Sequence, residues 1–327
     1  MKLLVIVLNY KVAKLTIECL HSLGAEIPAI AGAKVVVVEN GSRDGSEDVL
    51  SEAIQRHDWN GWVEFVSLSR NHGFTGGNNI IMRKALAGAE PPDYILLLNA
   101  DTMVQKRALQ VLVQFMDEHP DVGIAGSRLT FPDLRPQGTP FRFVGIVSEF
   151  DRGLGIGVVS RLLHRWTPCP PKPSTACSVD WVAGAAMMIR RQVIEAIGPL
   201  DEGYFAYFED MDYCLNAKRA NWPTWYVPES LIFHHEGCSS GILQEMKTRR
   251  PAYWFRARRR FFLKNFGITY SAFADVSYLV GCLLGRIQRV LQGKRNSDPP
   301  HSLRDSIRHS VFRSGIHLKE IDSEGAI

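Results

Sequence analysis

One short acidic loop follows a hydrophobic run of the kind that forms a buried strand. Residues 94–98 read YILLL, and the next four residues, NADT, place Asp101 where the chain would leave the core. Mg²⁺ and Mn²⁺ prefer oxygen ligands and commonly take one or two carboxylates together with substrate phosphates. Asp101 or Thr102 could equally cap the helix expected after them, because both residue types are good N-caps. The sequence leaves a metal ligand and a helix cap as equal alternatives.

A second acidic cluster lies in YFAYFEDMDYCL, residues 204–215. Glu209, Asp210 and Asp212 follow an aromatic run and open a stretch with helical spacing. The helix dipole favours acidic residues in a first turn, which is one explanation of the cluster. Carboxylates in a crowded, partly apolar site also gain proton affinity, as a general base requires. The cluster is therefore a candidate catalytic site.

Two adjacent histidines, His234 and His235, end the apolar stretch LIF. A single histidine is more often structural than a ligand. In a chain that already offers carboxylates, however, a histidine at the end of a strand is a candidate metal ligand.

Three further strand-like runs are each followed by a polar loop. The loops are Asn9-Tyr10, ENGSRDGSED at 39–48 and SRNHGFTGGNN at 69–79. Each alone could be a turn, a helix cap or a flexible connection. The GFTGG segment matches neither the dinucleotide-binding nor the P-loop glycine pattern. Together the loops indicate a ligand-binding site, because all of them are expected at one edge of the same sheet.

The elements that must position these loops alternate between strand and helix. We expect strands at 3–8, 34–39, 63–68 and 94–98, and helices around 15–23, 49–57, 78–87 and 109–116. This alternation predicts βαβ units in a mostly parallel sheet, where ligands bind at the carboxyl ends of the strands. Residues 131–178 are rich in Pro and Gly, and we expect a loop region there with one short helical patch near 158–166.

Taken in order, these segments resemble the family 2 glycosyltransferases, especially the rhamnosyltransferase-like branch. The resemblance covers roughly residues 3 to 240 and is carried by VIVLNY, VVVVENGSRDGS, NHGFTGGNN, YILLLNADT, WVAGAAMMIRR, GPLDEGYFAYFEDMDYCLNAKRANW and YVPESLIFHHEGCSS. It implies an α/β GT-A fold, with a Rossmann-like, mostly parallel central sheet flanked by helices and a helical C-terminal extension.

The resemblance also implies a division of the chain. The GT-A catalytic domain would occupy 1–245, with a nucleotide-sugar part at about 1–130 and an acceptor part at about 131–245. A basic, aromatic helical extension would follow at 246–292. The tail at 293–327 is polar, and we expect it to be loosely ordered.

Two sets of donor-site residues follow from the resemblance. The nucleotide-sugar donor would be held by Leu8, Asn9, Tyr10, Glu39, Asn40, Ser42, Arg70, Asn71, Asn78, Asn99 and Asp101. Mg²⁺ or Mn²⁺ would be bound by Asp101 and His234. The chain departs from the family pattern at Glu39, where the family usually has Asp, and at Asn99, which replaces the first Asp of the D-x-D motif.

The resemblance assigns Asp210 as the catalytic base, supported by Glu209 and Asp212. It assigns the acceptor-side wall to Trp181, Gly184 and Ala185. The implied activity is inverting transfer of a sugar, L-rhamnose from dTDP-rhamnose, to a hydroxyl of a saccharide or lipid-linked saccharide in cell-surface polysaccharide or glycolipid assembly.

Two other functions remain as alternatives. A nicotinamide-dependent oxidoreductase would share the sheet but lacks a glycine fingerprint after the first strand. A catalytically silent nucleotide-sugar binding protein would explain Glu39 and Asn99, whereas the intact Glu209-Asp210 pair favours an enzyme.

The charge of the chain is unevenly placed. The formal net charge is +4, yet residues 247–265 contain eight Lys and Arg and no acid. PAYWFRARRRFFLKNF, at 251–266, mixes aromatic and basic residues, which favours an anionic membrane surface over a helix packed on the catalytic domain. Nothing else in the chain supports nucleic acid as a partner.

The expected location is cytoplasmic, peripheral on the inner face of the cell membrane. The N-terminal run MKLLVIVLNY predicts a buried strand rather than a signal peptide. The six cysteines form no C-x-x-C pair, and we expect them to be reduced.

Overall fold

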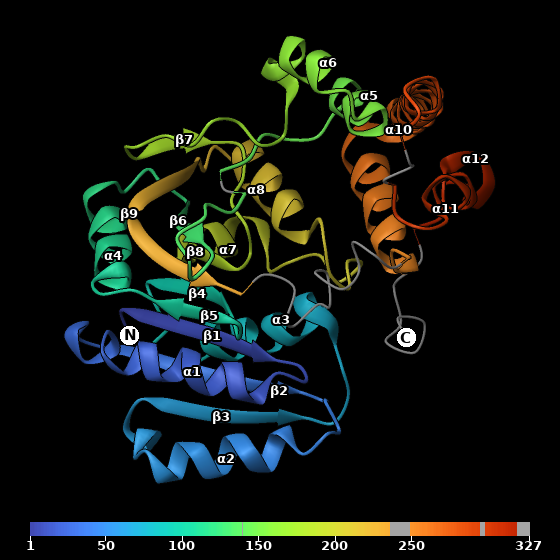
Figure 1. Ribbon diagram of the computed structural model, residues 1–327. Coiled ribbons are helices and arrows are strands. Elements are labelled where there is room, and N and C mark those ends of the chain that lie inside the picture. The colour runs from blue at the N-terminus through green and yellow to red at the C-terminus, as the bar shows by residue number, and fades with distance from the viewer. Residues whose placement is uncertain (139, 236–248, 295–297, 319–327) are drawn as a thin grey trace. The chain divides into compact units, whose positions relative to one another are not determined.

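The computed structural model describes residues 1–327 except 139, 236–248, 295–297 and 319–327 (Figure 1). The chain forms two compact units, each built from separated segments. The first unit comprises Met1–Pro140, Lys172–Asp201 and Glu209–Gly241, and the second comprises Phe141–Pro171, Glu202–Phe208 and Ile242–Ile327.

A nine-stranded sheet forms the centre of the first unit. Its strands are β1 (Leu3–Asn9), β2 (Ala33–Asn40), β3 (Val63–Leu68), β4 (Tyr94–Asn99), β5 (Thr102–Val104), β6 (Ile124–Thr130), β7 (Cys177–Val179), β8 (Ala186–Arg190) and β9 (Thr224–His234). The order is β3-β2-β1-β4-β8-β6-β9-β5, and β7 pairs with β9. The first four strands are parallel, β8 is antiparallel to β4, and β6 and β9 return to the direction of β4. The predicted mostly parallel α/β sheet is confirmed.

Helices cover both faces of this sheet because successive side chains of a strand point to opposite faces. In β1, Leu3, Val5 and Val7 face one core, while Leu4 and Ile6 face the other. The first core is closed by α1 (Ala13–Gly24), α2 (Ser46–Arg56) and α4 (Ala108–Glu118). The second is closed by α3 (Gly73–Leu86), α7 (Arg191–Ile197) and α8 (Glu209–Arg219).

Strand register brings the polar loops to one edge, as the sequence predicts. Asn9 at the end of β1 lies opposite Glu39 of β2, and Leu8 lies opposite Asn99 of β4. The carboxyl ends of these three strands are therefore level with one another.

The region after β4 excludes the helix-cap interpretation of Asp101 and Thr102. Thr102 begins the short strand β5, which pairs with β9, and α4 begins only at Ala108. The first backbone groups of α4 are bound instead by Glu26, whose carboxylate accepts from Arg107 N at 2.6 Å and from Leu109 N at 3.2 Å. Sequence spacing could not reveal this cap, since Glu26 lies far away in the chain.

Helix α3 begins at Gly73, five residues before the helix predicted at 78–87. The side chain of Asn71 accepts from Gly73 N at 2.8 Å and so binds one of the free N–H groups at the helix start. Its glycines allow close packing, because a Cβ on Gly77 would lie 2.6 Å from Leu8 Cδ1. The GFTGG segment is therefore the first turns of a helix rather than a flexible connection.

The second unit is helical. It contains α5 (Ile146–Leu154), α6 (Gly157–Leu162), α10 (Ala252–Leu291), α11 (Ser302–Arg308) and α12 (Val311–Ser314). Helix α5 precedes the helical patch predicted at 158–166, and two short helices lie within the polar tail. Helix α10 is bent at Gly267, which has a φ of 78° inside the helix.

Helices α5 and α10 touch backbone to backbone. A Cβ on Gly281 or Gly285 would overlap the carbonyl oxygen of Phe150 or Leu154. Only glycine permits this approach. Among the described residues, α10 is also the one helix whose length and composition would suffice to cross a bilayer.

A buried ion-pair network joins the same helices. Arg258, before the bend of α10, contacts Glu149 of α5 at 2.6 Å and Asp275, after the bend, at 2.5 Å. Asp275 also accepts from Val311 N of α12 at 2.9 Å. The network therefore fixes both halves of α10 to α5 and α12.

Candidate active site

The loops after β1 and β2 are held together through Glu39. Its carboxylate accepts from the side-chain amide of Asn9 and, at 2.5 Å, from Ser42 N. Ser42 in turn accepts from Lys11 N at 2.8 Å, and Asn9 Oδ1 accepts from Thr16 at 2.8 Å. Glu39 is buried, and both of its oxygens are used within the protein. Its observed contacts order the loops around the expected nucleotide position.

Asn40 and Asn71 tie the loop after β2 to the loop after β3. Asn40 Nδ2 donates to Asn71 Oδ1 at 3.0 Å, and His72 N donates to Asn40 Oδ1 at 3.0 Å. Gly41 lies between the two loops with a φ of 68°, and a Cβ there would overlap the backbone of Arg70. The glycine of the ENGS sequence is thus required by both conformation and close approach.

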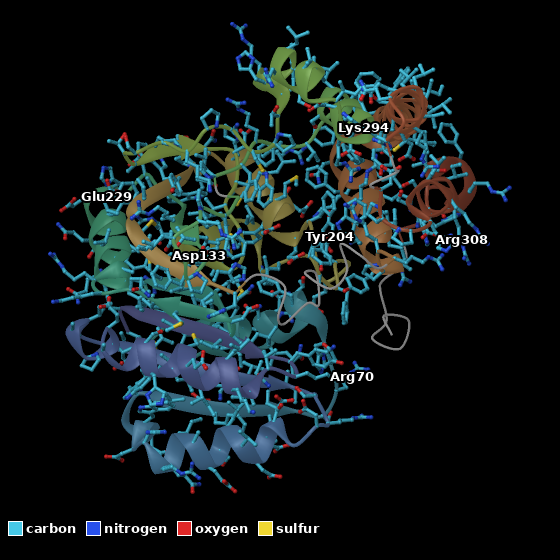
Figure 2. All side chains as sticks on the ribbon, viewed as in Figure 1. Arg70, Asp133, Tyr204, Glu229, Lys294 and Arg308 are labelled. Atoms are coloured by element: carbon cyan, nitrogen blue, oxygen red, sulfur yellow. The ribbon has the colours of Figure 1, made fainter. Side chains whose placement is uncertain are left out.

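The remaining predicted donor residues line the same edge. Arg70 is exposed beyond the end of β3 (Figure 2), and Leu8 and Tyr10 are half-buried at the end of β1. Asn78 is buried in α3, where its amide donates to Phe74 O at 2.8 Å. Its Oδ1 has no hydrogen-bond partner among the described residues.

Asp101 and His234 meet at the ends of β4 and β9. His234 Nε2 lies 3.4 Å from Asp101 Oδ1 and 3.4 Å from Asn99 Nδ2. Asp101 is only 1% exposed, and the pairing of Thr102 with His234 across β5 and β9 sets its position. His235 contributes through its backbone N, which donates to Asp101 O at 2.9 Å.

Gln137 orients His234 and was not predicted from the sequence. Its Oε1 lies 2.8 Å from His234 Nδ1, and its Nε2 donates to His234 O at 2.5 Å. An amide oxygen requires a proton on Nδ1, so in neutral His234 the lone pair is on Nε2, toward Asp101. Gln137 lies in the Pro-rich segment interpreted as a loop, and no motif marks it.

The Asp101–His234 pair suits a divalent cation. An imidazole lone pair and a carboxylate oxygen at 3.4 Å repel one another unless a metal ion or a proton lies between them. No cluster of three His, Cys, Asp or Glu ligands occurs among the described residues. Two protein ligands are nevertheless sufficient for Mg²⁺ or Mn²⁺ when substrate phosphates supply the others.

Asp210 is held by two backbone N–H groups. Its Oδ2 accepts from Gly184 N at 3.1 Å and its Oδ1 from Met211 N at 2.8 Å. Burial raises the pKa of the Asp210 carboxyl, while these two donors oppose the rise because they stabilise the carboxylate. Asp210 lies within the first turn of α8, and its bond to Gly184 reaches outside that helix.

Glu209 and Asp212 are more deeply buried than Asp210. Burial raises the pKa of Glu209 well above its ordinary value, and the Asp210 charge raises it further. Glu209 Oε2 has no hydrogen-bond partner among the described residues, whereas Asp212 accepts from Asn216 Nδ2 at 3.0 Å. Asp210 therefore ionises more readily than Glu209.

We expect Glu209→Gln to stabilise the protein at alkaline pH. A carboxyl whose pKa is higher in the folded protein than in the unfolded chain makes its full contribution to stability below the unfolded-state pKa, near 4.5. This contribution is lost as the pH rises through the folded-state pKa. Gln resembles the protonated form at every pH. The midpoint of thermal unfolding of the variant should exceed that of wild type at about pH 8 and match it at about pH 4. The exposed Glu229→Gln serves as control (Figure 2), and an equal pH dependence of wild type and Glu209→Gln would contradict the expectation.

Gly184 and Ala185 connect the two acidic clusters. Gly184 N donates to Asp210, and Ala185 O accepts from Asn99 N at 3.0 Å. Trp181 lies earlier in the same segment and packs against the second core of the sheet. Two of the three predicted acceptor-wall residues, Gly184 and Ala185, thus link Asp210 to Asn99 at the end of β4.

Comparison with known proteins identifies a family over most of the chain. The model of the family described as "Glycosyltransferase like family 2" matches residues 2–261. That range includes every residue of the site described above.

Curated relatives are about a quarter identical to the chain over the regions that align. Agl10 of Haloferax volcanii, a hexosyltransferase of low-salt glycan biosynthesis, is 27% identical over 224 residues, which are 66% of this chain and 62% of Agl10. The N-acetylglucosaminyl-diphospho-decaprenol L-rhamnosyltransferase of Mycobacterium tuberculosis is 27% identical over 67% of this chain and 71% of that enzyme. Rhamnosyltransferase WbbL of Escherichia coli is 26% identical over 59% of this chain and 71% of its own.

Solved structures share the fold at low sequence identity. GalNAc-T7 with UDP, GalNAc and Mn²⁺ has a TM-score of 0.60 at 14% identity, over 89% of this chain and 56% of that one. The mannosyltransferase PcManGT of Pyrobaculum calidifontis, with GDP-Man and Mn²⁺, has a TM-score of 0.56 at 12% identity, over 97% of this chain and 84% of that one. These likenesses confirm the GT-A fold.

Proposed function

Because the chain belongs to the family 2 glycosyltransferases, we propose that it transfers a hexose from a nucleotide-diphosphate donor to an acceptor hydroxyl, with inversion at the anomeric carbon. The observation that carries the proposal is the chain of contacts that links the two sites. Gly184 N donates to Asp210, Ala185 O accepts from Asn99 N, and the Asn99 side chain lies beside His234 of the Asp101–His234 pair. We propose L-rhamnose from dTDP-rhamnose as the donor sugar and a saccharide or lipid-linked saccharide as acceptor. The names of the relatives from M. tuberculosis and E. coli support rhamnose as the sugar, and the former name supports a lipid-linked acceptor.

The reaction requires a base on the acceptor side. Asp210 would accept the proton of the acceptor hydroxyl, whose oxygen forms a bond to the anomeric carbon as the bond from that carbon to the diphosphate oxygen breaks. The nucleoside diphosphate leaves with the electron pair. One base without a covalent nucleophile favours a single displacement and hence inversion. The N–H groups of Gly184 and Met211 stabilise the carboxylate form of Asp210 against the rise in its pKa that burial causes.

Charge develops on the leaving diphosphate during the reaction. We propose that Asp101 and His234 hold Mg²⁺ or Mn²⁺, oriented by Gln137 and accompanied by the neutral amide of Asn99. A bound divalent cation would neutralise the developing phosphate charge. We propose that exposed Arg70 and N–H groups in the first turn of α3 bind the same anion, as helix N-termini commonly do.

A thermal-shift screen of nucleotide sugars tests the proposal. Ligands that bind the native state raise its stability by mass action, so the cognate donor should give the largest shift, and only with Mg²⁺ or Mn²⁺ present. Transfer would then be measured with that donor and saccharide acceptors. Metal-dependent donor binding without hydrolysis or transfer would favour a silent binding protein instead.

We expect Gln137→Met to weaken Mn²⁺ binding in the presence of nucleoside diphosphate by about 10–100-fold, the usual effect of removing a residue that orients a metal-bound histidine. Met has similar volume but accepts no strong hydrogen bond from His234. Mn²⁺ electron paramagnetic resonance measures the affinity, and ¹⁵N chemical shifts of His234 report which ring nitrogen carries the proton.

Gln114→Met on the exposed face of α4 is the matched control. Gln137→Glu retains an acceptor for His234 Nδ1 and should recover part of the affinity. Unchanged affinity and an unchanged His234 tautomer in Gln137→Met would show that Gln137 has no positioning role.

A further inference from the structure

The second half of α10 has an apolar face that no described residue covers. From 271 to 291, every exposed residue of the helix is apolar. These residues, which we call the α10 stripe, are Phe273, Val276, Val280, Leu283, Leu284, Ile287, Val290 and Leu291. Their exposed fractions range from 43% for Val280 to 82% for Leu291.

The spacing of the α10 stripe places it on one side of the helix. Leu283–Leu284 and Val290–Leu291 are adjacent in sequence, and all other successive members are separated by three or four positions. Residues at that spacing are neighbours on a helical surface. The stripe runs for about 27 Å at 1.5 Å per residue. Soluble monomers rarely expose a continuous apolar patch of this extent, which indicates a binding surface.

The other side of the same helix is already packed. Gly281 and Gly285 meet the backbone of α5, and Asp275 is held by Arg258 and Val311 N. A helix with one packed side and one apolar side suits a position along the surface of an apolar medium, rather than across it.

Charge distinguishes between lipid and a second copy of the chain. The second unit contains 20 Lys and Arg and 10 Asp and Glu, so its formal charge is +10. Because the whole chain has a formal charge of +4, the first unit has a formal charge of −6. Two second units would repel each other. Asp275 is the only acid in α10 and is buried, so the helix lacks the opposite charges that commonly flank a helix–helix seam. Anionic lipid headgroups complement the positive charge.

This surface differs from the one that the sequence indicated. In the 251–266 segment, Phe255, Phe261 and Phe262 are buried within the second unit. Arg258 is buried there in its ion pairs with Glu149 and Asp275. These three aromatic residues therefore form core, Phe266 is partly exposed just before the bend at Gly267, and the α10 stripe lies after it.

We propose that the α10 stripe inserts into the headgroup region of an anionic lipid bilayer, with the helix lying along the membrane surface. The basic residues of the second unit supply the electrostatic attraction, and the stripe supplies apolar contact with the upper acyl chains. The inference goes beyond sugar transfer, and membrane binding can be measured without it.

Vesicle co-sedimentation of the full chain tests the proposal. Wild type should bind vesicles of phosphatidylcholine mixed with phosphatidylglycerol more tightly than phosphatidylcholine alone, and high salt should reduce the difference. Phe273→Ser combined with Leu283→Ser should weaken binding to the mixed vesicles by about tenfold or more, because two apolar side chains lose their contact with lipid. Both positions are exposed, so thermal unfolding should remain unchanged.

Val49→Ser, at an exposed apolar position of α2 in the first unit, is the matched control and should bind as wild type does. Failure of wild type to bind the mixed vesicles, or equal binding by the double variant, would overturn the inference. So would a dimer in sedimentation equilibrium that the double variant disrupts while vesicles have no effect. Donor hydrolysis measured without vesicles separates the two proposals: its absence, with vesicle binding intact, would count against sugar transfer alone.

Discussion

Asp210→Asn should lower sugar transfer by roughly 10²–10⁴-fold, the usual loss when a positioned general base is removed. Asn cannot accept the proton of the acceptor hydroxyl. The binding of nucleotide donor and metal should stay near wild type, because the donor contacts proposed here come from other residues. Initial transfer rates with saturating donor, together with calorimetric donor affinity, measure the two effects separately.

The hydrogen bonds of Asp210 add a second expectation. Gly184 N and Met211 N both donate to its carboxylate, and an amide offers an acceptor to only one of them. The N–H group left without its acceptor should cost about 1–3 kcal/mol, and removal of a buried charge should offset part of that cost at neutral pH, so denaturant unfolding should show at most a modest loss of stability. A helix-cap role predicts near-normal transfer and stability, since Asn caps as well as Asp. A folded Asp210→Asn protein with intact turnover would leave the proposed mechanism without its base.

Asp101→Asn should abolish metal-dependent donor binding and with it detectable transfer. Among the described residues, Asp101 supplies the only carboxylate of the proposed ion site, where Asn99 is neutral and His234 supplies no negative charge. Asn preserves the size of this buried side chain, so the loss would reflect charge rather than packing. Titration of donor with and without Mn²⁺, followed by calorimetry, measures the effect directly and does not depend on turnover.

The exposed Asp133→Asn is the matched control for charge (Figure 2). It removes one carboxylate of the first unit outside the proposed site and should leave donor affinity unchanged. His234→Ala should be milder than Asp101→Asn, since it removes a neutral ligand. If Asp101→Asn binds donor and Mn²⁺ as tightly as wild type, Asp101 is not a metal ligand.

The parallel strands could be predicted because their local pattern is unambiguous. Continuous apolar runs such as Val35–Val38 form strands that are buried on both faces, and the polar residues after them mark the edge where loops gather. The meeting of Asp101 with His234 was carried only by the family resemblance. It depends on the pairing of β5 with β9, and neither spacing nor composition indicates that pairing.

Contacts between distant parts of the chain were beyond sequence reasoning. Gln137 and His234 are 97 positions apart, and Glu26 caps a helix that begins 82 residues later. Helix α5 was also missed, because its partner surface is supplied by glycines of α10 more than a hundred residues away. A similar separation from Glu149 hid the burial of Arg258, whose segment was interpreted as favouring an anionic membrane surface.

The glycine contact between α5 and α10 has a consequence for the order of folding during synthesis. Helix α5 ends at Leu154, and the glycines of α10 that meet it are Gly281 and Gly285, so the ribosome adds well over a hundred residues between them. At about 5–20 residues per second, α5 waits roughly 6–25 s for the surface that buries it. In that interval the rest of the sheet is made and can fold. The second unit thus completes only after most of the first has been synthesised, and the nascent chain must keep α5 from aggregating until its partner emerges.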